Sequence, residues 1–128
     1  VLKAQRIGHG VRCLEDSALV AELRERQIPL EVCPTSNVCL GVAKSIADHP
    51  LPQLLAEGLY VTINSDDPPM FNTTLTDEYL KIAEAFDFSR ETIEQLALNA
   101  VRASLLPELT RTEMEARFQR EFAALGLG

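Results

Sequence analysis

Several residue types are scarce in this sequence of 128 residues. It has no tryptophan, only two histidines and three cysteines. No run reaches the roughly 18 apolar residues that a membrane-spanning helix needs, which argues against a membrane protein. The amino terminus has neither an initiator methionine nor the apolar stretch of a signal peptide. We therefore expect a cytoplasmic protein that is cut from a longer chain.

Basic residues are also in the minority, at 12 against 19 acidic ones, and they are scattered. This pattern lacks the electrostatic footprint of a protein that binds nucleic acid or an anionic membrane, so neither partner is expected. The odd set of Cys13, Cys33 and Cys39 contains no C-x-x-C pair and predicts reduced thiols. Their individual roles stay open.

The residues that are abundant indicate one α/β domain. Apolar residues make up 46% of the chain and charged residues 24%, as in a folded globular protein. Short apolar runs alternate with helical patterns, which favours a parallel sheet built from βαβ units. Strands are expected at about residues 4–7, 28–33 and 59–64. Helices are expected from Asp16, from about residue 50, over 76–86, over 89–105, and from Thr110 to about residue 126.

Two local patterns add detail to this prediction. Residues 34–37 have the composition of a turn that closes the second strand. The spacing from Thr110 to Glu113 is that of a capping box, which predicts the start of the last helix. On that helix Phe118 and Phe122 lie four residues apart, and we expect both to pack in the core.

Polar and ionisable residues follow each expected strand at the point where it stops. They are His9, the segment 33–36, and the pair Asp66 and Asp67. In parallel α/β sheets, ligands bind beyond the carboxyl ends of the strands, where such loops converge. These residues are therefore the candidates for a functional site.

The chemistry of these candidates leaves alternatives open. Two adjacent carboxylates need a cation, hydrogen-bond donors or a shared proton, so Asp66 and Asp67 either bind a metal ion or form only a turn. His9 lies between two glycines, where it could ligate a metal, transfer a proton, stabilise charge, or serve only structure. His49 precedes a proline and is assigned to the loop that starts a helix.

Four segments resemble the motifs of one family. Residues 6–10, R-I-G-H-G, followed by L-E-D at 14–16, are similar to a segment of the adenosine deaminase family. So are E-V-C-P-T-S-N at 31–37, N-S-D-D-P at 64–68, and the stretch from N-A at 99–100 to L-P at 106–107. The four segments occur in the family order and cover most of the chain.

This resemblance implies a (β/α)8 barrel with one catalytic Zn²⁺ that hydrolyses the 6-amino group of adenosine to give inosine and ammonia. It implies that Asp66 ligates the zinc and that Asp67 binds the purine ring at N7. His9 would lie beside the zinc-bound water and orient the attacking hydroxide. The substrate would be a purine nucleoside.

The family's H-x-H pair and H-A-G-E motif, with the remaining zinc histidines and the proton-donating glutamate, are absent here. Residues 1–128 are therefore expected to be one partial domain, about strands 6 to 8 of the barrel and the helices after them. The amino-terminal strands would complete it, and the chain alone is expected to be inactive.

Two alternatives remain. One is an adenine deaminase of the same family, although the adenine-specific branch tends to have aspartate where Gly8 stands, which favours the nucleoside. The other is a non-catalytic truncated module that needs a partner chain.

Overall fold

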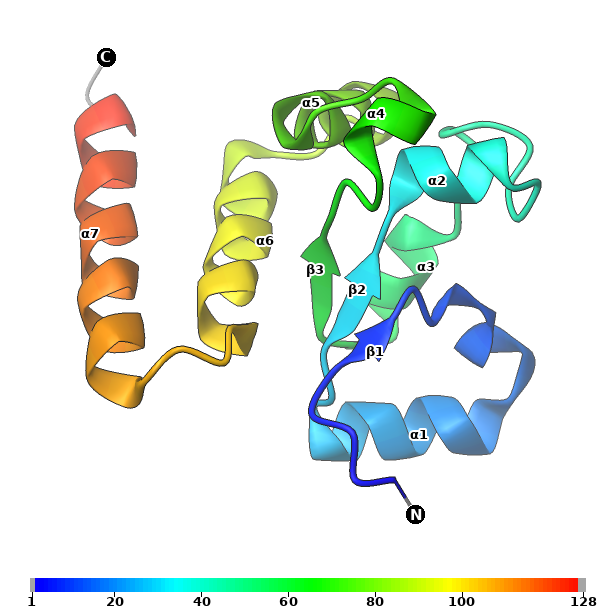
Figure 1. The fold of residues 1–128 in the computed structure, drawn as a ribbon, viewed down its shortest axis with the longest axis horizontal. Helices are drawn as coiled ribbons and strands as arrows, with labels where there is room; N and C mark the ends of the chain where they lie inside the picture. The colour runs from blue at the N-terminus through cyan, green and yellow to red at the C-terminus, as the bar shows by residue number, and fades with distance from the viewer. Residues whose placement is uncertain (1, 127–128) are drawn as a thin grey trace.

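The computed structural model describes residues 2–126 (Figure 1). In chain order the elements are β1 (Ile7–Gly8), the 3-10 helix η1 (Val11–Glu15), α1 (Ser17–Arg26), β2 (Leu30–Val32), α2 (Pro34–Cys39), α3 (Leu51–Ala56), β3 (Val61–Ile63), α4 (Pro68–Phe71), α5 (Leu75–Phe86), α6 (Arg90–Ala103) and α7 (Glu108–Gly126). None of the described helices is both long and apolar enough to cross a membrane.

The three strands form a parallel sheet in the order β1-β2-β3, which confirms the expected βαβ arrangement. Ile7 pairs with Leu30, and Leu30 pairs with Val61. All three residues of β3 are buried, and so are Leu30 and Val32 of β2. The core lies around these strands and includes fully buried leucines of α3 and Ile82 of α5.

The helix starts follow mainly from capping side chains. Oδ1 of Asp16 accepts hydrogen bonds from the amides of Ala18 and Leu19, so the predicted cap of α1 is confirmed. Ser89 caps α6 as expected, through a bond from the amide of Thr92. Helix α5 begins with a capping box between Thr74 and Asp77, slightly before the expected start.

Several expected boundaries are wrong. Residues 34–37 form the first turns of α2 and not a closing turn, because Pro34 occupies a first-turn position where its missing N–H is harmless. The last helix begins before Thr110, since the amide of Arg111 already donates to the carbonyl of Pro107. The first strand covers residues 7–8 instead of 4–7, and α6 ends at Ala103 instead of Leu105.

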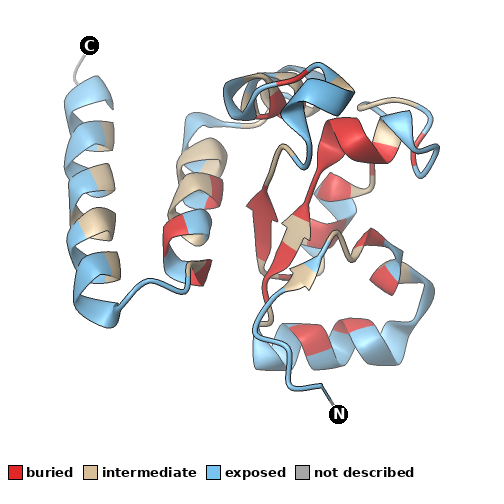
Figure 2. Ribbon diagram, in the orientation of Figure 1, coloured by how far each residue is buried: buried red, intermediate tan, exposed pale blue. Residues whose placement is uncertain are grey.

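The helices differ in where they lie around the sheet and in how deeply they are buried. The strand arrowheads point toward α2, α4 and α5, while α6 stands beside β3 and α7 lies beyond α6 (Figure 1). Buried residues concentrate on β2, β3 and α2, and α7 has none among its described residues (Figure 2). Phe118 and Phe122 are therefore only half-buried and contact each other edge-to-face, with ring centroids 5.9 Å apart, so the prediction that they pack in the core is wrong.

Candidate active site

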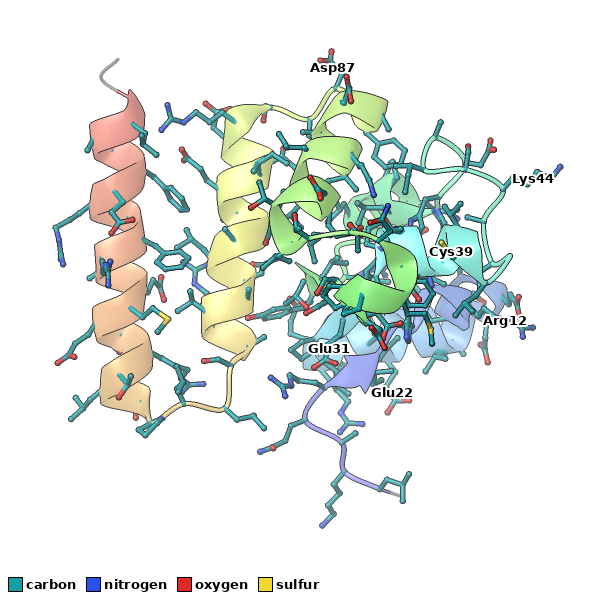
Figure 3. The ribbon with its side chains drawn as sticks, turned by 45° about the horizontal axis from the view of Figure 1, so that its top comes forward. Arg12, Glu22, Glu31, Cys39, Lys44 and Asp87 are labelled. Atoms are coloured by element: carbon teal, nitrogen blue, oxygen red, sulfur yellow. The ribbon has the colours of Figure 1, made fainter. Side chains whose placement is uncertain are left out.

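The carboxyl ends of the three strands bring the expected site residues to one edge of the sheet. Because the strands are parallel, the residues that follow them emerge on the same side. His9 follows β1, Cys33 follows β2 and Asp66 comes shortly after β3, and all three line one open cleft together with Glu31 and Asn64. Figure 3 turns this edge toward the viewer. The predicted convergence of the three strand ends is confirmed.

The backbone holds two of these residues in an uncommon conformation. His9 and Asp66 both have φ of 58°, in the left-handed region that non-glycine residues rarely adopt. Gln27, Asn72 and Asp87 share this conformation, and each of them ends a helix. Lys3, near the amino terminus, also has a positive φ. His9 is held there by its amide, which donates to the carbonyl of Glu31 over 2.8 Å. Such conformations concentrate at binding and catalytic sites.

The glycines that flank His9 differ in their roles. Gly10 has φ of 77°, and a Cβ atom there would lie 2.9 Å from Cδ2 of Leu30, so both the conformation and the space require glycine. Gly8 has no such constraint, because a Cβ atom there would meet nothing within 4 Å. Among the described residues, neither the backbone conformation nor the available space therefore requires glycine at position 8.

His9 and Asp66 face each other across the cleft. Nε2 of His9 lies 3.6 Å from Oδ2 of Asp66, and the two side chains are 41% and 35% exposed. Oδ2 also accepts a hydrogen bond of 2.7 Å from the hydroxyl of Ser36. Oδ1 has no hydrogen-bond donor among the described residues. One carboxylate oxygen is thus fixed by the protein while the other is available to a ligand.

Cys33 completes a group of three possible metal donors. One donor atom each from His9, Cys33 and Asp66 lie within 4.8 Å of one another. Burial, with the nearby carboxylates of Asp66, Glu78 and Glu31, raises the pKa of the Cys33 thiol to about 12. The thiol therefore keeps its proton, and its sulfur lies 3.5 Å from the carbonyl of Glu31 as a weak donor. A histidine nitrogen and a carboxylate oxygen are donors that a zinc ion takes, so the donor types at this edge are compatible with zinc, and metal binding by Asp66 stays a prediction.

Asp67 takes a different position from its neighbour. It is the N-cap of the short helix α4, where Oδ1 accepts a hydrogen bond from the amide of Met70. Asp67 is exposed and does not line the cleft of His9 and Asp66. Residues 66–69 are therefore not only a turn, because Pro68 and Pro69 begin helix α4. A substrate-binding role for Asp67 stays a prediction.

Sequence reasoning missed the buried polar residues beneath the site. Glu78 of α5 is 0% exposed. Its carboxylate accepts from the amide of Thr35 over 3.1 Å and from the hydroxyl of Thr73 over 2.8 Å, which ties α2 to α5. His49, assigned to loop structure, is 3% exposed and hydrogen-bonds Asn37. Ser36 and Asn37 lie in a segment that the motifs had marked, whereas a helical glutamate carries no signal of burial.

Comparison with known proteins identifies the class to which this fold and site belong. A family model described as "Adenosine deaminase" matches residues 1–120. The chain therefore belongs to the adenosine deaminase family.

The chain is also similar to individual members of this family. The chain is 42% identical over 123 residues to an aminodeoxyfutalosine deaminase of Streptomyces avermitilis, covering 96% of this chain and 34% of the relative. It is 44% identical over 118 residues to an adenine deaminase of Chelativorans sp., covering 92% and 36%. The chain thus spans about a third of the length of the curated relatives it matches.

Solved structures agree with the expected partial barrel. The crystal structure of an adenine deaminase from Arthrobacter aurescens superposes with a TM-score of 0.90 at 39% identity, covering 94% of this chain and 37% of that one. An amidohydrolase from Burkholderia ambifaria, solved with bound Zn, gives a TM-score of 0.86 at 25% identity, covering 96% and 35%. The described residues are one portion of a (β/α)8 barrel, as expected.

Proposed function

We propose that the protein containing this chain is a zinc-dependent purine deaminase that hydrolyses the 6-amino group of adenine. The observation that carries the proposal is the meeting of His9 and Asp66 at the carboxyl edge of a barrel sheet in a member of this family. Adenine takes the place of adenosine as first choice, because relatives from several bacteria that share 43–50% of the aligned residues are named adenine deaminases. The narrower expectation of adenosine has no such support.

Asp66 would hold the metal through its free carboxylate oxygen, Oδ1. Only part of a metal centre can come from this chain, because its second histidine, His49, is buried and bonded elsewhere. The other ligands and the proton-donating glutamate would come from the amino-terminal strands, so the chain alone would be inactive. A bound zinc ion would lower the pKa of a water molecule to about 7, which would supply a nucleophile at neutral pH.

The remaining site residues would act on the substrate and the attacking water. His9, opposite Asp66, would hold a proton at the cleft and orient the water toward the purine ring. Asp67 has one carboxylate oxygen engaged as the cap of α4, and its other oxygen would hydrogen-bond N7 of the purine. Because N7 and a carboxylate both accept, this contact requires a proton on one of them.

A second candidate substrate is a purine nucleoside, and the observation that favours it is Gly8. Within the described residues, the space that a Cβ atom at Gly8 would enter is free. The family resemblance implies aspartate at this position in the adenine-specific branch, and its side chain would occupy this space. A base and a nucleoside differ by the group on N9, so this space would decide between them.

The test is a comparison of kcat/KM for adenine and adenosine in the complete gene product, with zinc content measured on the same sample. We expect bound zinc and deamination of adenine. Gly8→Asp should lower kcat/KM for adenosine about tenfold or more, if Gly8 admits the sugar, while adenine is spared. A zinc-free protein that deaminates neither compound would contradict the proposal and favour the non-catalytic module.

A further inference from the structure

A buried hydrogen-bond chain leads from the start of α3 to the imidazole of His9. The amide of Leu51 donates to Nδ1 of His49 over 3.0 Å, and Nε2 of His49 lies 2.8 Å from Oδ1 of Asn37. Nδ2 of Asn37 then lies 3.4 Å from Nδ1 of His9. Asn37 and His49 are 2% and 3% exposed, so water does not compete for these groups.

The direction of every bond in this chain follows from its first member. A backbone N–H can only donate, so Nδ1 of His49 must accept and the proton of the neutral ring is on Nε2. Burial lowers the pKa of His49 and so favours the neutral ring, although the charge of Glu78 opposes this. The proton on Nε2 fixes the oxygen of the Asn37 amide toward His49, and its NH₂ group therefore faces His9.

The last bond determines the state of His9. The amide NH₂ can only donate, so Nδ1 of His9 accepts, and the proton of its neutral ring must be on Nε2, the atom that faces Asp66. We propose that Asn37 and His49 are positioning residues that hold His9 in the tautomer with its proton on Nε2, directed into the cleft. The part of this inference that concerns catalysis rests on the proposed function.

This assignment separates two roles that the sequence leaves open for His9. With Nδ1 accepting from Asn37 and Nε2 protonated, the neutral ring has no free lone pair for a metal ion. His9 therefore does not act as a metal ligand, although it belongs to the group of three possible donors. It presents an N–H to an oxygen atom bound in the cleft. The proton position of His49, passed on through the amide of Asn37, thus makes His9 a hydrogen-bond donor at Nε2.

The test is ¹⁵N NMR of the complete, metal-free protein labelled at histidine, well above the ordinary histidine pKa of about 6.5. The signals of His9 are identified by their loss in His9→Ala. We expect a protonated Nε2 and an unprotonated Nδ1. The opposite pattern would overturn the inference by itself, without any variant.

Asn37→Asp is the sharpest variant, because it keeps the acceptor for His49 and removes the donor to His9. Nδ1 of His9 should then become protonated, and the metal-loaded enzyme should lose about 10- to 100-fold in kcat with KM within about threefold. His49→Gln, which retains one donor and one acceptor, is the conservative control and should keep the wild-type tautomer. A folded Asn37→Asp protein with an unchanged His9 spectrum would overturn the proposal.

The two proposals fail in different ways. A protein with the expected tautomer that deaminates no purine contradicts the proposed function and supports the hydrogen-bond chain. An active deaminase with His9 protonated on Nδ1 supports the function and overturns the chain.

Discussion

The carboxyl edge of the sheet and the α6–α7 pair are built in contrasting ways. Beneath the partly exposed His9 and Asp66 of the edge, the supporting polar side chains are almost fully buried and hydrogen-bonded, with Ser36 at 1% and Glu78 at 0% exposure. Helix α7 buries no residue, and the Arg102–Glu115 ion pair, at 2.6 Å, joins it to α6. Its Phe118 and Phe122 are half-buried and contact each other. Figure 2 shows the same contrast between α2 and α7.

This contrast shows in which region stability and function depend on the positions of individual side chains. A buried polar group is costly unless it is bonded, so every member of the network at the edge constrains its neighbours. Exposed ion pairs contribute little, typically below about 1 kcal/mol, and tolerate changes in geometry. Substitutions should therefore have large effects at the edge and small effects on α7.

The largest effect is expected at Asp66. Asp66→Ala in the complete protein should abolish zinc binding and lower kcat by a factor of about 10² to 10³ or more, since it removes a charged group at the reacting centre. Metal analysis and steady-state kinetics measure both quantities.

Substitutions of two neighbouring residues that should leave zinc bound are the controls for Asp66→Ala. His9→Ala should lower kcat with zinc retained, and Asp67→Asn should keep zinc while raising KM. Full zinc content and a normal rate in Asp66→Ala would show that the metal site is elsewhere.

The second-largest effect is expected at Glu78, and it concerns the free energy of unfolding. Glu78→Ala leaves the amide of Thr35 and the hydroxyl of Thr73 without their acceptor and opens a cavity, so the free energy of unfolding should fall by about 2–4 kcal/mol. Urea denaturation measures this change. Glu84→Ala, at an exposed position on the same helix, should change it by less than about 0.5 kcal/mol. Equal effects of the two substitutions would contradict the network.

The smallest effect is expected on α7. Phe118→Ala should lower the free energy of unfolding by about 1 kcal/mol, because it removes one half-buried edge-to-face contact with Phe122. Urea denaturation of the single variants and of the double variant with Phe122→Ala isolates the pair. A loss as large as that of Glu78→Ala would place α7 in the core and remove the contrast.

The sequence predicted those parts of the fold that depend on local chemistry. Asp16 and Ser89 cap helices as expected, and the alternating apolar runs form the parallel strands. The false capping box at Thr110 shows the limit of such patterns, because the helix already starts at Glu108. The true box, Thr74 with Asp77, has aspartate where the usual pattern has glutamate or glutamine.

For the candidate site, too, the sequence predicted the residues at the strand ends but not the buried residues that support them. The strand ends located His9 and Asp66, since parallel strands bring their carboxyl ends together. The residues that support them were not predictable, because burial of Glu78 or His49 depends on contacts between distant segments. Helical periodicity treats a charged residue as exposed unless its buried partner is known.

The bonds that define the site also constrain the order in which the protein can fold. Glu78 and Thr35 are 43 residues apart, Ser36 and Asp66 are 30 apart, and His9 and Asn37 are 28 apart. Each bond therefore requires closure of a long loop, whose entropy must be overcome before the bond forms. The bond between Glu78 and Thr35 cannot form until α5 has docked. A nascent chain that ends before residue 78 carries His9 and Asp66 without the carboxylate that ties α2 to α5.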